Sequence, residues 1–225
     1  MSLFGSYTEG FNAPIFSSAP EPQLADQYEA GIKTEFMDGR LSSTLTYFDL
    51  TKTNISTRTG IPNVFDVNGE VQNQGVEVDL SGALTDHWRL IGTFSYIDSE
   101  ITKDRDESGD LGNQGNRLVN VPRYMGSLWT AYEFGDLGWP GLTAGAGAFF
   151  VGQREGDNAN TFQLPGYGRV DLALGYSRPI GPTKVSVQLN VENLLDKEYF
   201  ASTFNRNNIA PGAPRTFLGQ IRVEF

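Results

Sequence analysis

Alternation of apolar and polar side chains with a period of two is the feature that most constrains the fold of this chain. In the segment 216–225 the apolar positions are Phe217, Gly219, Ile221, Val223 and Phe225. The segments 167–176 and 184–193 repeat the alternation, and helical spacing is nowhere sustained. Because successive side chains of a β-strand point to opposite faces, these segments are expected to be strands with one apolar and one polar face.

About ten such segments can be drawn, and the connectors between them alternate between short and long. The segments span roughly residues 2–9, 27–37, 40–52, 70–83, 87–100, 122–135, 141–153, 166–178, 183–194 and 214–225. The long connectors are roughly 10–26, 53–69, 101–121, 154–165 and 195–213. One short connector is Asp38-Gly39, a typical hairpin turn. Short turns on one side and long loops on the other are typical of outer-membrane β-barrels, whose long loops face outwards.

Composition excludes several classes of protein. The chain has no cysteine, which excludes a disulfide scaffold and thiolate metal sites. Its formal net charge of −10 argues against a nucleic-acid partner. No apolar stretch approaches the ~18 residues of a transmembrane helix. The first residues lack the basic and apolar regions of a signal peptide, so either an upstream segment is missing or the chain is not exported on its own.

Aromatic residues make up 12% of the chain and gather near the expected strand ends, for example Tyr47, Trp88 and Tyr132. Aromatic belts at the two membrane interfaces have this distribution. The alternative is the core of an ordinary β-sandwich, which would not need such asymmetric connectors. A sheet that spans a membrane must close, because unpaired backbone groups at an edge are costly in hydrocarbon. The strands therefore either form a small closed barrel or belong to a larger one.

Seven short stretches carry a resemblance to a known family. They are Tyr28 to Lys33, Asp38 to Leu41, Gln74 to Gly82, Leu84 to Trp88, Leu164 to Tyr167, Asn190 to Tyr199 and Gly212 to Thr216. In their order and spacing they resemble the TonB-dependent siderophore receptors of the Gram-negative outer membrane. The resemblance implies an all-β, antiparallel transmembrane barrel of about 22 strands plugged by an N-terminal domain.

Residues 1–225 would then be the C-terminal portion of that barrel, and the plug domain, the TonB-contacting segment and the first strands would be absent. The implied function is TonB-dependent uptake of ferric siderophores, with no resident cofactor and no enzymatic activity. The implied partners are the ferric siderophore, the TonB complex through the missing plug, outer-membrane lipid and lipopolysaccharide. Because energy coupling in the family runs through the plug, the chain is not expected to transport alone. The terminal Phe225 resembles the signal that the barrel-assembly machinery reads.

Ferric siderophores are bulky chelates that aromatic rings and guanidinium groups suit well. The candidate ligand-binding residues in the long loops are Phe16, Phe65, Arg117, Arg154, Phe162, Phe204 and Arg206. The alternative role of each is loop packing or contact with lipopolysaccharide. Seven charged residues are expected to face the lumen and to form Arg–carboxylate pairs between strands. They are Glu35, Asp79, Glu133, Arg169, Asp171, Arg222 and Glu224.

Three further motifs are weaker. The run Asp104 to Asp110 resembles the start of a calcium loop, but its twelfth position is Gly115 and not a glutamate, so a solvated acidic loop is favoured and no metal site is expected. His87, the only histidine, is expected to anchor a periplasmic turn beside Trp88. Gly145-Ala146-Gly147 lacks the third glycine of a dinucleotide site and is expected to let the strand pass close to whatever fills the lumen.

Two alternative functions remain open at this level. One is a self-closing small barrel with a structural or adhesin role. The other is an outer-membrane hydrolase that would use His87 as a catalytic base.

Overall fold

The computed structural model describes residues 1–13, 21–58, 65–104 and 112–225, without the side chains of 56–58, 65–68 and 204. Phe16 therefore lies outside the described residues, as do residues 105–110 of the calcium-like run.

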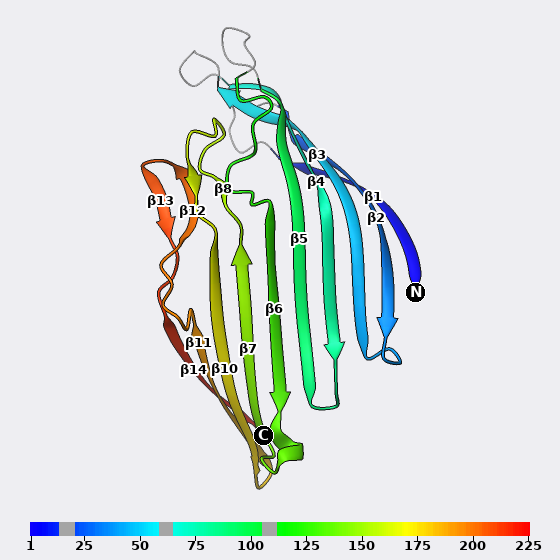
Figure 1. Cartoon of the computed structure of the whole chain (residues 1–225), viewed down its shortest axis with the longest axis vertical. Coiled ribbons are helices and arrows are strands. Elements are labelled where there is room, and N and C mark those ends of the chain that lie inside the picture. The colour runs from blue at the N-terminus through cyan, green and yellow to red at the C-terminus, as the bar shows by residue number, and fades with distance from the viewer. Residues whose placement is uncertain (14–20, 59–64, 105–111) are drawn as a thin grey trace.

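A single antiparallel sheet of ten strands forms the body of the molecule (Figure 1). The strands are β1 (Ser2–Asn12), β2 (Gln23–Phe36), β3 (Leu41–Arg58), β4 (Phe65–Ala83), β5 (Trp88–Lys103), β6 (Tyr124–Glu133), β7 (Leu142–Val151), β10 (Tyr167–Ile180), β11 (Thr183–Glu192) and β14 (Thr216–Glu224). They pair in chain order, so β1 and β14 are the two edges of the sheet. Within the described residues β1 pairs with β2 and β14 with β11, which does not favour a self-closed barrel of ten strands.

All ten segments predicted from the alternation are strands, although their ends differ. Strands β3 and β4 run further into their connector than predicted, because their ladder continues from Leu41↔Gly82 to Arg58↔Phe65 through register shifts. The expected strand 122–135 begins only at Tyr124 and gives way at Phe134 to the 3-10 turn η1 (Phe134–Leu137). Two short hairpins in the long connectors carried no alternation signal. They are β8 (Arg154–Glu155) with β9 (Gln163–Leu164), and β12 (Phe200–Asn205) with β13 (Asn208–Pro211).

The register assigns each side chain to one of two faces. Cross-strand partners in an antiparallel ladder point to the same face, and the partners Leu172↔Val191 and Val191↔Phe217 define the apolar face. When the cross-strand partners are followed from strand to strand, all seven residues predicted to face the lumen lie on the opposite, polar face. That prediction is confirmed.

Ion pairs on the polar face follow the predicted chemistry but not always the predicted geometry. Arg89 and Glu133 pair between neighbouring strands at 3.5 Å. The pairs Arg169–Asp171 and Arg222–Glu224, each 2.8 Å, join residues two positions apart on one strand. A guanidinium on a long side chain reaches the next residue on its own face as easily as a neighbouring strand.

Within the described residues, no second layer covers the apolar face. Ile221 is 75% exposed, and Phe225 continues the apolar face of β14 and is fully exposed. A single-layer sheet with an uncovered apolar face and a polar face is the arrangement that strands facing lipid require. Among the described residues, no helix is long and apolar enough to cross a membrane.

Glycines on the polar face make room for an aromatic side chain. A Cβ atom on Gly145 or Gly147 of β7 would lie 2.8 Å or 2.2 Å from ring atoms of Trp129, which belongs to β6. The small residues of Gly145-Ala146-Gly147 therefore accommodate an indole of the barrel wall itself, which gives this run a structural role inside the sheet.

Candidate functional site

The described parts of the long connectors lie at one end of the sheet, opposite the short turns (Figure 1). We call residues 112–123, 152–166 and 193–215 the loop cluster. The three segments are joined by hydrogen bonds between one another, and residues of the second and third segments line a cavity together with Tyr167.

Asn193 organises the start and the end of the last segment. Its side chain is 1% exposed, and its Nδ2 donates to the carbonyl oxygens of Lys197 and Ala213 at 2.9 and 3.0 Å. Its Oδ1 accepts the backbone N–H of Lys197 at 2.8 Å, and its own backbone N–H donates to Asp171 Oδ1 on β10 at 2.8 Å. With φ of 53°, Asn193 occupies the left-handed region, which asparagine tolerates better than most residues. One residue thus closes the turn after β11 and binds both ends of the connector.

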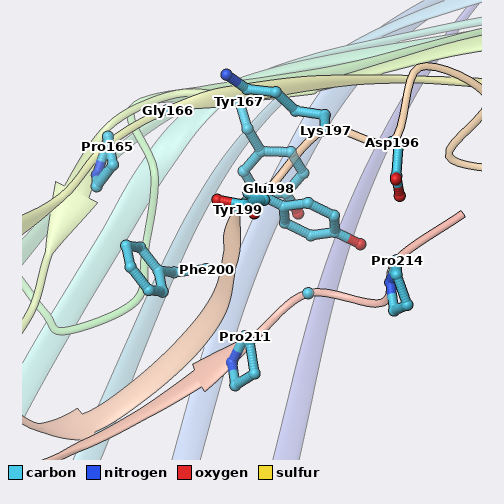
Figure 2. Close-up of a pocket in the computed structure, with 11 residues that line it drawn as sticks. Pro165, Gly166, Tyr167, Asp196, Lys197, Glu198, Tyr199, Phe200, Pro211 and Pro214 are labelled. Carbon is cyan, nitrogen blue, oxygen red and sulfur yellow. The ribbon is translucent and has the colours of Figure 1, made fainter.

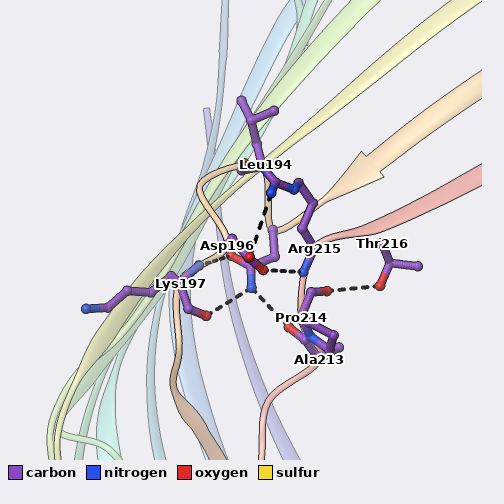
Figure 3. Close-up of polar contacts among 8 residues, drawn as sticks. Leu194, Asp196, Lys197, Ala213, Pro214, Arg215 and Thr216 are labelled. Atoms are coloured by element: carbon purple, nitrogen blue, oxygen red, sulfur yellow. Dashed lines mark hydrogen bonds and ion pairs between the residues drawn. The ribbon is translucent and has the colours of Figure 1, made fainter.

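Asp196 and Arg215 form a second connection across the same turn (Figure 3). Asp196 Oδ1 accepts the backbone N–H of Arg215 at 2.9 Å, and the two side chains form an ion pair at 3.7 Å. Arg215 Nη1 also donates to the carbonyl oxygen of Leu194 at 3.3 Å. The chain therefore enters β14 from a fixed position.

A cavity of about 570 Å³ lies beside this turn (Figure 2). Its lining combines aromatic rings, prolines and charged groups: Tyr167, Tyr199, Phe200, Pro165, Pro211, Pro214, Asp196, Lys197 and Glu198. We call it the loop pocket. Its volume lies in the range of small-molecule sites, and its mixed lining can cover apolar surface while offering a few charged groups.

Two stacked tyrosines line the loop pocket. The rings of Tyr167 and Tyr199 lie 4.2 Å apart at 27°, a stacked arrangement. A Cβ atom on Gly212 would lie 2.2 Å from the ring of Tyr199, so the ring fits closely against backbone there. Tyr167 shares the polar face with Arg169 on β10, so the pocket opens at the loop end of that face.

Next to Tyr167 on the polar face, Arg169 and Asp171 form a charged pair in which Asp171 is buried and Arg169 is half-buried. Arg169 donates to Asp171 at 2.8 Å and its guanidinium lies 5.0 Å from the centre of the Phe149 ring. Asp171 also accepts the Asn193 N–H. The pair therefore links β10 directly to the turn that shapes the pocket.

Arg154, predicted to bind a ligand, faces inward. It is 4% exposed, and its Nη2 donates to the carbonyl oxygens of Phe200 and Ala201 at 2.6 and 2.8 Å. Its guanidinium lies 5.8 Å from the centre of the Tyr167 ring. Burial lowers the pKa of Arg154 from its usual value, against the opposing effect of nearby Tyr167. The Arg154 side chain therefore contacts Phe200 and Tyr167, which line the pocket, and does not line it itself.

The other predicted residues divide into three groups. Arg117 is bound to Asp98 at 2.7 Å and to the carbonyl oxygen of Ile97 at 3.1 Å. Phe162 and Arg206 come together, with the guanidinium 5.0 Å from the ring centre, and Arg206 donates to the Thr161 carbonyl at 3.0 Å.

Phe65 and Phe204 lie on β4 and β12 by their backbone, and their side chains lie outside the described ones, as does Phe16 entirely. The direct ligand-binding role of all seven candidates stays a prediction.

Neither alternative chemistry gains support. In the part of the chain that the structure describes, no group of three or more His, Cys, Asp or Glu side chains could hold a metal ion. Asp104 instead accepts the backbone N–H and the side-chain amide of Asn113 at 3.0 and 2.7 Å. His87 lies beside Trp88 in a short turn, where its carbonyl accepts the Glu133 N–H at 2.9 Å.

The sequence reasoning missed Tyr167, Tyr199 and Phe200. The first two lie in the stretches Leu164 to Tyr167 and Asn190 to Tyr199, whose only sequence signal is the resemblance to the family. An aromatic residue at the end of a turn was the available signal, but nothing in the sequence shows that two such turns stack against each other.

Comparison with known proteins agrees with this architecture. The family model described as "TonB dependent receptor-like, beta-barrel" matches residues 1–194. The metal-pseudopaline receptor CntO of Pseudomonas aeruginosa is 37% identical over 232 residues, covering 100% of this chain and 32% of that protein. The ferrichrome outer membrane transporter and phage receptor of Escherichia coli is 34% identical, covering 91% of this chain and 27% of that protein.

Among solved structures, the siderophore receptor PiuA of Acinetobacter baumannii superposes with a TM-score of 0.81 at 30% identity. The match covers 99% of this chain and 34% of PiuA. The chain thus spans about a third of the length of the curated relatives it matches. These relatives are receptors and transporters and not enzymes.

Proposed function

The chain belongs to the TonB-dependent receptor β-barrel family, and on that premise we propose that it supplies the C-terminal strands of an outer-membrane receptor that takes up ferric siderophores or related metal chelates. The family is one of Gram-negative outer-membrane barrels, so the apolar face lies against lipid, the polar face lines the lumen and the loop cluster lies outside the cell. Further strands would pair with the edges β1 and β14, because an unpaired edge is costly in hydrocarbon.

The observation that carries this proposal is the loop pocket. It combines stacked tyrosines, prolines and charged side chains at the extracellular end of the lumen face. A bulky chelate presents both apolar surface and charge, and a concave site of this size and mixture can bind both. Lys197 is the cationic side chain that lines the pocket, whereas Arg154 is buried behind it.

Uptake is the direct test. Because residues 1–225 lack the plug and are not expected to transport alone, the intact receptor that contains them is expressed in a Gram-negative strain lacking its own siderophore receptors. Radiolabelled metal is supplied as ferrichrome, ferrioxamine B, ferric preacinetobactin or metal-pseudopaline. We expect uptake of at least one chelate, and its loss when the strain lacks TonB. Absence of uptake of all four, with the protein present in the outer membrane, would argue against the proposal.

Two variants test the pocket itself. Tyr199→Ala removes the ring that stacks on Tyr167 and should weaken binding of the transported chelate by about fivefold, since an aromatic contact contributes about 1 kcal/mol beyond its buried area. Tyr199→Phe keeps the ring and serves as the matched control. Equal affinities for both variants and the unsubstituted protein would place the binding site elsewhere.

We further expect no hydrolase activity, a role for lipid and lipopolysaccharide at the apolar face, and recognition of Phe225 during barrel assembly. The exposed position of Phe225 on the apolar face is compatible with that recognition.

A further inference from the structure

Arg154 contacts two walls of the loop pocket from outside it. Its Nη2 donates to the carbonyl oxygens of Phe200 and Ala201, and its guanidinium lies over the ring of Tyr167. Phe200 and Tyr167 both line the pocket, but they belong to different segments, β12 and β10. One side chain therefore sets the distance between them.

The guanidinium itself is poorly placed to meet a ligand. Arg154 is 4% exposed, and its Nη1 has no hydrogen-bond partner among the described residues. A planar guanidinium holds two carbonyl oxygens in a fixed geometry and packs flat against an aromatic ring, and lysine reproduces only the first of these contacts in part. Arg154 thus connects two chain segments, β12 and the start of β10.

A second connection holds the same hairpin. The side chain of Asn120 donates to the Thr203 carbonyl at 2.6 Å and accepts the Thr203 N–H at 3.0 Å. The backbone N–H of Asn120 donates to the Glu155 carbonyl at 3.0 Å, next to Arg154. The hairpin β12–β13 is therefore attached to both other segments of the loop cluster.

From these contacts we propose that Arg154 is a positioning residue for ligand binding: it fixes the hairpin β12–β13, and with it Phe200, against Tyr167, so that the loop pocket is already shaped before a ligand arrives. This rests on the proposed function of the pocket. A preformed site loses less conformational freedom on binding, so Arg154 raises the affinity for the ligand without contacting it.

The mobility of the hairpin β12–β13 tests the positioning role of Arg154 without any ligand. Because the chain has no cysteine, Ser202→Cys provides a unique attachment site for a nitroxide label on β12, and Pro182→Cys provides one at the opposite end of the sheet. Spectra are recorded from the intact receptor in outer-membrane vesicles, with any cysteine outside residues 1–225 replaced. Arg154→Met should increase the mobility of the label at 202 and leave that at 182 unchanged, with Arg154→Lys between.

Arg117→Met is the matched control, because it removes a loop guanidinium whose partners are Asp98 and Ile97 on β5. It should leave the label at 202 as immobile as in the unsubstituted protein. An immobile label in Arg154→Met, or equal changes at 202 and 182, would overturn the proposal.

Affinity tests the functional part. For the chelate transported among the four named above, Arg154→Met should raise the apparent Kd about tenfold and leave saturated uptake within about twofold, with partial recovery in Arg154→Lys. Transport with unchanged affinity in Arg154→Met would overturn the positioning role alone. Absence of uptake by the unsubstituted protein would instead overturn the proposed function.

Discussion

The sheet and the loop cluster are stabilised in opposite ways. In the sheet, continuous backbone ladders join each strand to its neighbours, and side chains such as Leu189 and Ile221 point outward from a single layer. In the loop cluster the ladders are short, and β8–β9 has only two pairs. There the order comes from buried polar side chains, among them Asn193 and Arg154.

In the loop cluster, asparagine side chains form hydrogen bonds with backbone groups that a neighbouring strand would bind in a sheet. Asn120 makes both a donor and an acceptor bond with the backbone of Thr203, and Asn160 does the same with the backbone of Arg117. A primary amide presents the same donor and acceptor pair as a peptide group, so it can complete a bridge where no strand continues. The comparison indicates that the sheet depends on the polarity of each face, whereas the loop cluster depends on individual residues.

The largest effect is expected from a charge on the apolar face of the sheet. Leu189→Arg should lower the free energy of unfolding by about 3 kcal/mol, because a lipid-facing arginine near the middle of a strand must leave water. Gln188→Arg, one residue earlier and on the polar face, should change it little. Unfolding in urea with lipid vesicles measures both, and equal losses would show that the two faces do not differ as assigned.

A buried amide of the loop cluster comes next. Asn193→Gly keeps the left-handed backbone but removes three side-chain hydrogen bonds, and should lower the free energy of local opening by about 2 kcal/mol. Asn193→Ala should lose about 1 kcal/mol more because of its φ of 53°.

Hydrogen exchange of residues 194–216, compared with that of β10, measures this opening. Faster exchange throughout the sheet would contradict the separation of the two regions.

The Asn120 bridge should have a smaller effect. Asn120→Gly removes both bonds to Thr203 and should ease opening of the hairpin β12–β13 by about 1 kcal/mol. Asn116→Ala, which removes a single exposed bond to the Asn158 carbonyl, is the control and should have less effect. Exchange rates of the β12 amides distinguish the two, and a larger effect of Asn116→Ala would refute the bridge.

The smallest effect is one of pH. The Thr161 hydroxyl, the Thr161 and Asn160 backbone N–H groups and nearby Arg206 lower the pKa of Asp157 from its usual value, against the opposing effect of desolvation. Because the folded pKa is the lower one, this stabilisation is complete above the unfolded pKa, near 4, and is lost as the pH falls through the folded value.

Proteolysis of the segment 152–166 should therefore accelerate slightly below about pH 4. Asp157→Asn should abolish that change, and an unaltered pH profile in this variant would assign the effect to another group.

The fold was largely predictable because its pattern is local. Alternation fixes which side chains share a face, and the lengths of the connectors fix which strand ends lie together, so the ten strands and the lumen-facing residues Glu35, Asp79 and Arg169 follow from the sequence. The ends of the strands do not follow from the alternation, since the pair Arg58↔Phe65 depends on register shifts that interrupt it.

The site was decided by the tertiary structure. The sequence shows that Arg154 is a cation in a long loop, but its role depends on the backbone carbonyls of Phe200 and Ala201, more than forty residues away. Likewise the Tyr167–Tyr199 stack joins two turns, and the sequence of neither turn shows that they lie close together. A repeating face is encoded within each strand, whereas a pocket between loops is a set of long-range contacts, and only the folded chain specifies them.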